Sequence, residues 1–337
     1  MRDDDYLWDP AATADPEIQR LENALRPLRF RGEGEGAPLA IPRPRRRWPR
    51  VAAALAAAAA VAAIGIGAWL RSFDSPWTVS PIRGSVAVGA EQARATEQLA
   101  PGDWVQTSPD AAARIRVGRI GSAELGPGSR ARLVRARGKE HRMAMEYGTM
   151  HARIWAPPRF FLVETPSALA IDLGCVYTLR LDARGAGVLR VESGEVELVR
   201  GGRRAFVVAG NEATLAPDVG PGLPYPVAAD SAFRAALAGY EANGGDEALA
   251  RLLAASSAKT TITLWHLLQR VGADHRDAVY ARLAELAPPP DGVTRDAVLR
   301  IERRDLQRWR RAMERSWTTE SVPAWKRAWR RLWTMTA

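Results

Sequence analysis

The chain has 337 residues, and its 48 Lys and Arg against 38 Asp and Glu give a formal net charge of +10. The length exceeds that of a usual single domain, so more than one folded unit is expected, and the cationic excess suits nucleic acid, anionic lipid or acidic glycan. Cys175 is the one cysteine, which excludes a disulfide framework or a cysteine-based metal site within one chain.

Residues 1–30 form a short charged tail in which one helix is predicted. Asp15 is a suitable N-cap and Pro16 a suitable first-turn residue, so a helix is expected from Pro16 to about Leu25. Its apolar residues recur at helical spacing and form a stripe: Ile18, Leu21, Leu25 and Leu28. Because so short a helix is marginal alone, we expect the stripe to bind a partner; a frayed tail without a partner is the alternative.

A basic linker, residues 31–50, precedes an uncharged run, residues 51–70. As a helix, this run would span roughly 30 Å, which matches the hydrocarbon core of a bilayer. The Arg cluster on its N-terminal side predicts a single transmembrane helix with residues 1–50 in the cytoplasm and the body outside, which argues against nucleic acid. A soluble Ala-rich helix is the alternative.

From residue 77 to residue 217 the apolar pattern has period two, which predicts β-strands. Short alternating segments are separated by turns rich in Gly, and their inward positions are Ile115, Val117, Met143, Met145, Phe161, Val163, Leu179, Leu181, Val196 and Leu198. Many short strands at about ten-residue spacing indicate an antiparallel β-sandwich or β-roll. The fold class is therefore mainly β plus α.

This β region also carries a spaced series of motifs: GDWVQT (102–107), ELGPGSRARL (124–133), EYGTMHARI (146–154), FFLVETPSALAIDLGCVYTL (160–179), GEVELV (194–199) and VVAG (207–210). Together they resemble the FecR family over residues 82–216. The resemblance implies an anti-sigma regulator or sensor of the bacterial inner membrane, with a periplasmic body and an N-terminal segment that contacts an extracytoplasmic-function (ECF) sigma factor. The tail is shorter than the multi-helix anti-sigma domain common in that family, and the small C-terminal domain of some members is not evident.

A Pro/Gly linker, residues 218–229, leads to a helical domain, residues 230–337. The first helix is expected to be capped by Asp230 or Ser231 and to stop at Gly244. The helical segments share apolar positions that predict one core: Leu249, Leu252, Leu253, Leu264, Leu267, Leu268, Val279, Leu283 and Leu286.

The C-terminal tail interleaves tryptophans, including Trp309 and Trp317, with arginines. Its candidate contacts with the membrane or with glycan are Trp325, Trp329, Trp333, Arg327 and Arg330. Indole and guanidinium groups on one helix suit the headgroup level of a bilayer or a stacked sugar. The alternative is that the tryptophans pack onto the preceding helices under the arginine stems.

Catalytic chemistry has weak support in this sequence. Cys175 with His141 and His151 could hold a thiolate and a base, but the Cys lies in an apolar segment, where a buried position is expected. The histidines, which include His266 and His275, lack metal-ligand spacing and are expected as surface or strand-edge residues. No nucleotide-binding glycine motif occurs, so we expect no enzyme, no metal and no cofactor.

The preferred hypothesis is a single-pass inner-membrane regulator whose tail acts on an ECF sigma factor in response to a periplasmic signal. The alternative is a membrane-tethered scaffold that binds glycan or an envelope protein in the periplasm and sends no signal. The inducing signal, the sigma factor and the oligomeric state are not encoded in any motif that we identify.

Overall fold

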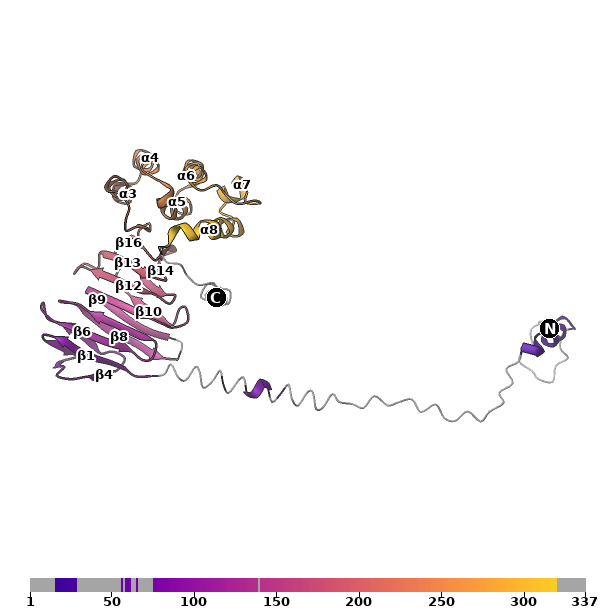
Figure 1. The fold of residues 1–337 in the computed structure, drawn as a ribbon, viewed down its shortest axis with the longest axis horizontal. Helices are drawn as coiled ribbons and strands as arrows, with labels where there is room; N and C mark the ends of the chain where they lie inside the picture. The colour runs from indigo at the N-terminus through magenta and orange to yellow at the C-terminus, as the bar shows by residue number, and fades with distance from the viewer. Residues whose placement is uncertain are drawn as a thin grey trace. The chain divides into compact units, whose positions relative to one another are not determined.

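The computed structural model describes residues 16–28, 56, 58–61, 65, 75–138 and 140–319 (Figure 1). The chain divides into two units, Met1–Ala60 and Val61–Ala337. In the first unit the predicted tail helix is present as α1 (Pro16–Leu25), followed by a 3-10 turn, η2 (Arg26–Leu28). Glu17 in the first turn of α1 favours this helix, because a negative charge there offsets the helix dipole.

The predicted membrane helix, residues 51–70, falls mostly outside the described residues, as does the whole basic linker, residues 31–50. Those residues of the run that are described are helical: Ala56, Ala58, Ala59, Ala60, Val61 and Gly65. Within the described parts of the chain, no helix is both long enough and apolar enough to cross a bilayer.

Residues 77–226 form two sheets that share one long strand, β9 (Glu140–Ile154). Sheet A runs in the order β4 (Glu97–Leu99), β1 (Trp77–Arg83), β6 (Ala112–Val117), β7 (Gly121–Leu125), β9, β12 (Val176–Leu181), β13 (Gly187–Ser193) and β16 (Asn211–Ala216), with β17 (Gly220–Pro221) and β18 (Tyr225–Pro226) paired to β16. Sheet B runs in the order β3 (Glu91–Gln92), β2 (Val86–Val88), β5 (Trp104–Thr107), β8 (Arg130–Arg137), β9, β10 (Phe161–Glu164), β11 (Leu169–Asp172), β14 (Glu195–Arg200) and β15 (Arg203–Val208). Among the described strands every pair is antiparallel except β9 with β10.

Strand β9 passes from one sheet to the other at Gly148. Its first half pairs with β8 in sheet B, and its second half, from Gly148 onward, pairs with β7 and β12 in sheet A. Gly148 has φ +105°, and a Cβ at this position would collide with Ser129. Glycine is therefore required where the strand bends.

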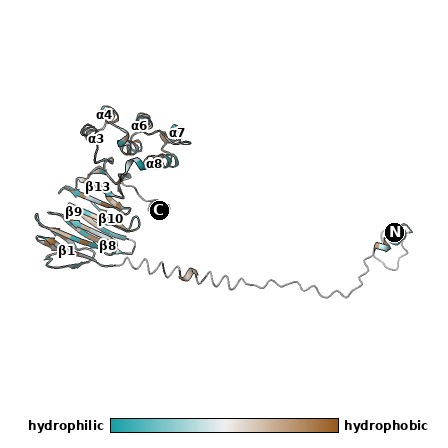
Figure 2. Ribbon diagram, viewed as in Figure 1, coloured by the Kyte–Doolittle hydropathy of each residue, from teal (hydrophilic) through white to brown (hydrophobic). Residues whose placement is uncertain are grey.

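The core of the β region lies between the two sheets. All ten inward positions expected from the period-two pattern are buried, and Trp77 is the largest of the fully buried side chains. Figure 2 shows apolar and polar residues mixed along the same strands, as expected when one face of each strand is buried. The mainly antiparallel β fold predicted from the sequence is confirmed.

The segment expected as a linker, residues 218–229, carries β17 and β18 and packs against its neighbours. Leu223 is buried there, and its backbone N–H donates to Oε1 of Glu241 at 2.5 Å. The segment therefore joins the β region to the helices by hydrogen bonds as well as by the chain.

The C-terminal domain contains the helices α3 (Ser231–Asn243), α4 (Asp246–Ala254), α5 (Thr261–Leu268), α6 (Ala273–Leu286), α7 (Arg295–Leu299) and α8 (Arg303–Trp317), with a 3-10 turn η3 (Ala258–Thr260). The expected cap is present, since Oδ1 of Asp230 accepts a hydrogen bond from the Phe233 N–H at 2.7 Å. Gly244 ends α3 with φ 62°. The predicted apolar positions form one core, in which Leu253 and Leu286 are partly buried.

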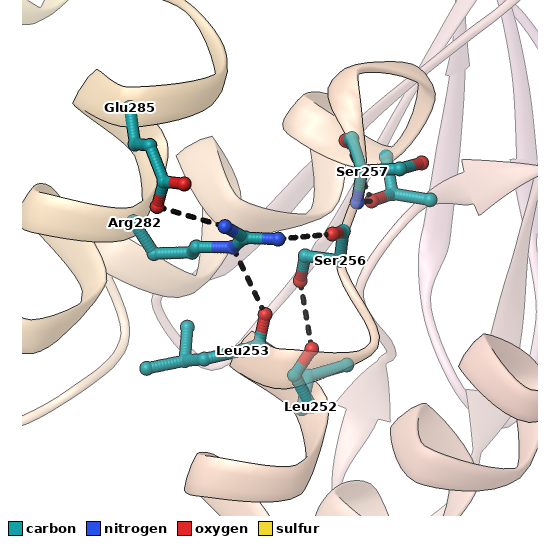
Figure 3. Close-up of polar contacts among 7 residues, drawn as sticks. Leu252, Leu253, Ser256, Ser257, Arg282 and Glu285 are labelled. Carbon is teal, nitrogen blue, oxygen red and sulfur yellow. Dashed lines mark hydrogen bonds and ion pairs between the residues drawn. The ribbon is translucent and has the colours of Figure 1, made fainter.

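Arg282 on α6 donates hydrogen bonds to backbone carbonyls at the C-terminal end of α4 and just after it (Figure 3). It donates to the carbonyls of Leu253 at 3.2 Å and Ser256 at 2.7 Å, and it also pairs with Glu285 at 2.8 Å. Carbonyls near a helix end lack partners within the helix, so this arginine supplies a donor to the Ser256 carbonyl and a further donor to the Leu253 carbonyl, which also accepts the Ser256 N–H at 3.2 Å. The contact fixes α4 against α6.

Candidate functional site

The tail helix α1 presents the predicted apolar stripe to solvent. The exposed fractions are 64% for Leu21, 53% for Leu25 and 78% for Leu28, while the side chain of Ile18 lies outside the described residues. Large apolar side chains in a row on a short, otherwise polar helix are typical of segments that dock into a groove. The stripe is therefore the candidate binding site of the first unit.

The candidate contacts in the C-terminal tail, Trp325, Trp329, Trp333, Arg327 and Arg330, lie outside the described residues. Trp309 and Trp317, which precede them, are buried on α8 within the helical core. For these two tryptophans, packing onto the preceding helices is what the structure shows.

Two of the four histidines expected at the surface are buried, which corrects that prediction for His141 and His266. Nδ1 of His141 accepts a hydrogen bond from Nε1 of Trp77 at 3.1 Å, and the two rings stack. A buried polar ring is tolerated when it is hydrogen-bonded, and such a distant partner is invisible in local sequence. His151 and His275 are partly exposed, and the described residues contain no cluster of metal-ligating side chains.

A cluster of side chains that no sequence motif revealed joins the β region to the helices. Arg310 on α8 pairs with Glu195 at 2.8 Å, and its guanidinium lies 4.3 Å from the ring centre of Phe206 and 5.7 Å from that of Trp265. Together with His266, these residues form what we call the β–α junction. Buried charge pairs and cation–π contacts of this kind favour one fixed geometry.

His266 holds the centre of the β–α junction as a neutral ring. Its Nε2 accepts the Phe206 N–H at 3.0 Å, and Nδ1 lies 2.8 Å from the Ile262 carbonyl. The pKa of His266 is lowered to about 3, mainly by burial; the hydrogen bond with the Ile262 carbonyl opposes this shift, and the charges of Arg270 and Arg310 contribute to it. The ring therefore links a strand of sheet B to α5 without carrying charge near neutral pH.

A hydrogen bond from Asn211 supports the same junction. Its Nδ2 donates to the Trp317 carbonyl at 2.7 Å, which connects the start of β16 to the end of α8. Arg270 adds hydrogen bonds to the carbonyls of Pro221 at 3.0 Å and Gly222 at 3.1 Å. The β region and the helices are thus held together as one body.

Cys175 has the buried position expected from its apolar segment. Its thiol donates to Oδ2 of Asp172 at 2.7 Å, just before β12 begins. A buried thiol next to a carboxylate is a poor nucleophile, because the thiolate would be desolvated and would face a like charge.

We expect Cys175 to resist alkylation in the native protein and to react when the protein is unfolded. Exposure of the full chain to iodoacetamide with and without denaturant, followed by mass spectrometry, measures this difference. Modification at equal rates in both conditions would contradict the buried assignment and would reopen the thiol as a candidate nucleophile.

Comparisons with known proteins give sparse similarity. No protein-family model matches the chain. No curated protein matches it either. A solved candidate anti-sigma factor from Parabacteroides distasonis ATCC 8503, at 2.50 Å, is similar with a TM-score of 0.32 and 15% identity, over 40% of this chain and 64% of that one. A second such structure, at 1.65 Å, has a TM-score of 0.28 and 18% identity, over 42% of this chain and 63% of the other.

In both cases the chain covers less than two thirds of the solved protein. Similarity at these TM-scores does not assign this chain to a family or to a function.

Proposed function

We propose that this protein is a single-pass inner-membrane regulator of the FecR kind. Its tail binds an ECF sigma factor in the cytoplasm, its apolar run, residues 51–70, crosses the membrane, and its β and helical regions bind a periplasmic protein or glycan. The observation that carries this proposal is the exposed stripe on α1, with Leu21 and Leu25 unburied on one helix face.

The body is proposed to bind rather than to catalyse. Two of its buried polar groups make structural contacts: Glu195 pairs with Arg310, and His266 accepts a hydrogen bond from the Phe206 backbone. A junction of this kind suits a rigid receptor, in which a ligand on the sheets and a partner on the helices act on the same body. The FecR-like motifs identified in the sequence support the same class.

The test is capture of a sigma factor by the full-length protein, solubilised from its host membrane in mild detergent. In the variant Leu21→Asp with Leu25→Asp, two charges replace the stripe. We expect capture to fall by at least about 100-fold, because central apolar residues dominate the energy of such interfaces.

The matched control is Gln19→Asp with Asn23→Asp, which adds the same charge on the opposite face of α1. This control is expected to retain capture. Equal loss in both variants would show a general charge effect and would contradict the stripe. Capture of no sigma factor by the unmodified chain would favour the alternative, a tethered periplasmic scaffold.

A further inference from the structure

One end of sheet A gathers the start of β1 and the end of β9. Thr78 on β1 is in register with Arg116, Arg116 with Ser122, and Ser122 with Arg153 on β9. Beyond the last pairs, the Trp155 N–H donates to the Ile120 carbonyl at 2.7 Å. With strands about 4.8 Å apart, Trp155 lies on the order of 15 Å from the start of β1, at the same end of the sheet.

This end of sheet A carries a patch that we call the Trp155 patch: Arg116, Arg119, Arg153 and Trp155. All four residues are exposed, and Trp155 has 72% of its surface free. Arg116 and Arg153 alternate with buried neighbours, so they project from the outer face of the sheet, and Trp155 follows Arg153 by two residues on the same side.

The charge of the Trp155 patch is uncompensated. Within the described residues no carboxylate lies within ion-pair distance of its three arginines, whereas two other arginines of the same face are paired, Arg114 with Glu124 at 2.8 Å and Arg190 with Glu212 at 2.7 Å. An unpaired cationic group around an exposed indole is expected to meet an anionic surface.

The patch lies at the end of sheet A where β1 begins, and β1 follows the apolar run closely in the sequence. Only four residues, 71–74, lie between Leu70 and Ser75 in the sequence, which limits the Cα–Cα reach to about 17 Å. Indole rings favour the headgroup level of a bilayer, and arginines near its surface are attracted by anionic lipids. So short a tether also keeps the patch at high effective concentration over that surface.

We propose that the Trp155 patch docks on the anionic headgroups of the bilayer from which the chain emerges. The inference rests on the proposed membrane anchor, residues 51–70. Docking would fix the tilt of sheet A against the membrane and hold the rigid β–helix body in one orientation. The occupant is the phospholipid surface itself, not a separate protein.

The test uses the full chain reconstituted in lipid nanodiscs, with a fluorophore attached at Ser122→Cys beside the patch. The same fluorophore at Arg184→Cys, in the turn between β12 and β13 at the opposite end of sheet A, is the reference position. A quencher is attached to the lipid headgroups, and the discs contain phosphatidylglycerol or only phosphatidylcholine. The unmodified chain, whose one cysteine is the buried Cys175, is treated with the fluorophore in the same way and gives the background signal.

We expect quenching at position 122 to be at least threefold stronger in anionic than in neutral discs, with no such difference at position 184. In the patch variant, Arg116→Gln, Arg119→Gln, Arg153→Gln and Trp155→Ala, quenching at position 122 in anionic discs should fall to the value seen in neutral discs. The matched control, Arg114→Gln, Arg180→Gln and Arg190→Gln, removes the same charge from the same face and should leave the quenching at position 122 unchanged. Circular dichroism of each variant verifies that the β region is folded.

Two results would overturn the docking proposal and leave the membrane anchor intact. One is equal quenching in anionic and neutral discs, and the other is an equal loss of quenching in the patch variant and in the control variant. Failure of the chain to enter nanodiscs at all would instead overturn the anchor, and the docking proposal with it. The two failures are thus distinguishable in one experiment.

Discussion

Replacing Trp309 by alanine is expected to destabilise the helical domain by about 3–5 kcal/mol. The ring is fully buried on α8 and lies 5.5 Å from the ring of Tyr280, and its Nε1 donates to the Ala287 carbonyl at 3.0 Å. The substitution would leave both a cavity and an unpaired carbonyl at the end of α6. Urea unfolding of the full chain, followed by far-ultraviolet circular dichroism, measures the loss.

Trp155→Ala is the natural control, because it removes the same side chain from an exposed position. That change is expected to alter the free energy of unfolding by less than about 0.5 kcal/mol. If Trp309→Ala behaved like Trp155→Ala, α8 would not belong to the helical core, and the β–α junction that depends on α8 would have to be abandoned.

Local patterns sufficed for most of the fold. The period-two positions such as Ile115 and Leu179 were predicted correctly, because a strand buried on one face has apolar and polar residues in alternation. The start and end of α3 were predicted for a similar reason, since Asp230 and Gly244 act on backbone groups within a few residues of themselves.

The parts that sequence did not reveal depend on partners far along the chain. Arg310 and Glu195 are 115 residues apart, and Asn211 and Trp317 are 106 residues apart. Helix α8 was hidden for a further reason: its arginine-rich composition obscured a buried stripe, which consists of Leu306, Trp309, Met313 and Trp317. Composition alone did not separate these tryptophans from those beyond residue 319.

The two candidate surfaces differ in the same way. The stripe of α1 was predictable because Leu21 and Leu25 lie on one helix and their spacing is visible in the sequence. The Trp155 patch was not, since Arg116 and Arg153 meet only through the register of β6 and β9 on either side of β7. Register between strands follows from the packed sheet and not from any one segment.

The buried ring of His266 is expected to lower the stability of the body as the pH drops from about 6.5 to 4.5. In the unfolded chain its pKa returns to the ordinary histidine value of 6.5, whereas in the fold the pKa is lowered to about 3, mainly by burial. Below pH 6.5 the unfolded state therefore binds a proton that the folded state excludes. The stabilisation is fully present above pH 6.5 and is lost at up to about 1.4 kcal/mol per pH unit as the pH falls toward 3.

The window from pH 6.5 to 4.5 separates the contribution of this histidine from those of Asp110 and Glu140. The pKa values of Asp110 and Glu140 are lowered by hydrogen bonds from Ser108 and Arg135, so their contribution is lost only at still lower pH. Across the window we expect a loss of about 2–3 kcal/mol in the unmodified protein. Urea unfolding at a series of pH values gives the slope.

His266→Gln is the informative variant, because an amide oxygen can accept the Phe206 N–H but does not titrate. Its absolute stability is expected to be lower, yet its slope between pH 6.5 and 4.5 should be smaller by the contribution of His266. Equal slopes in the unmodified protein and in His266→Gln would mean that the ring is not held neutral between Phe206 and α5, because a ring free to take up a proton in the fold gives no linkage.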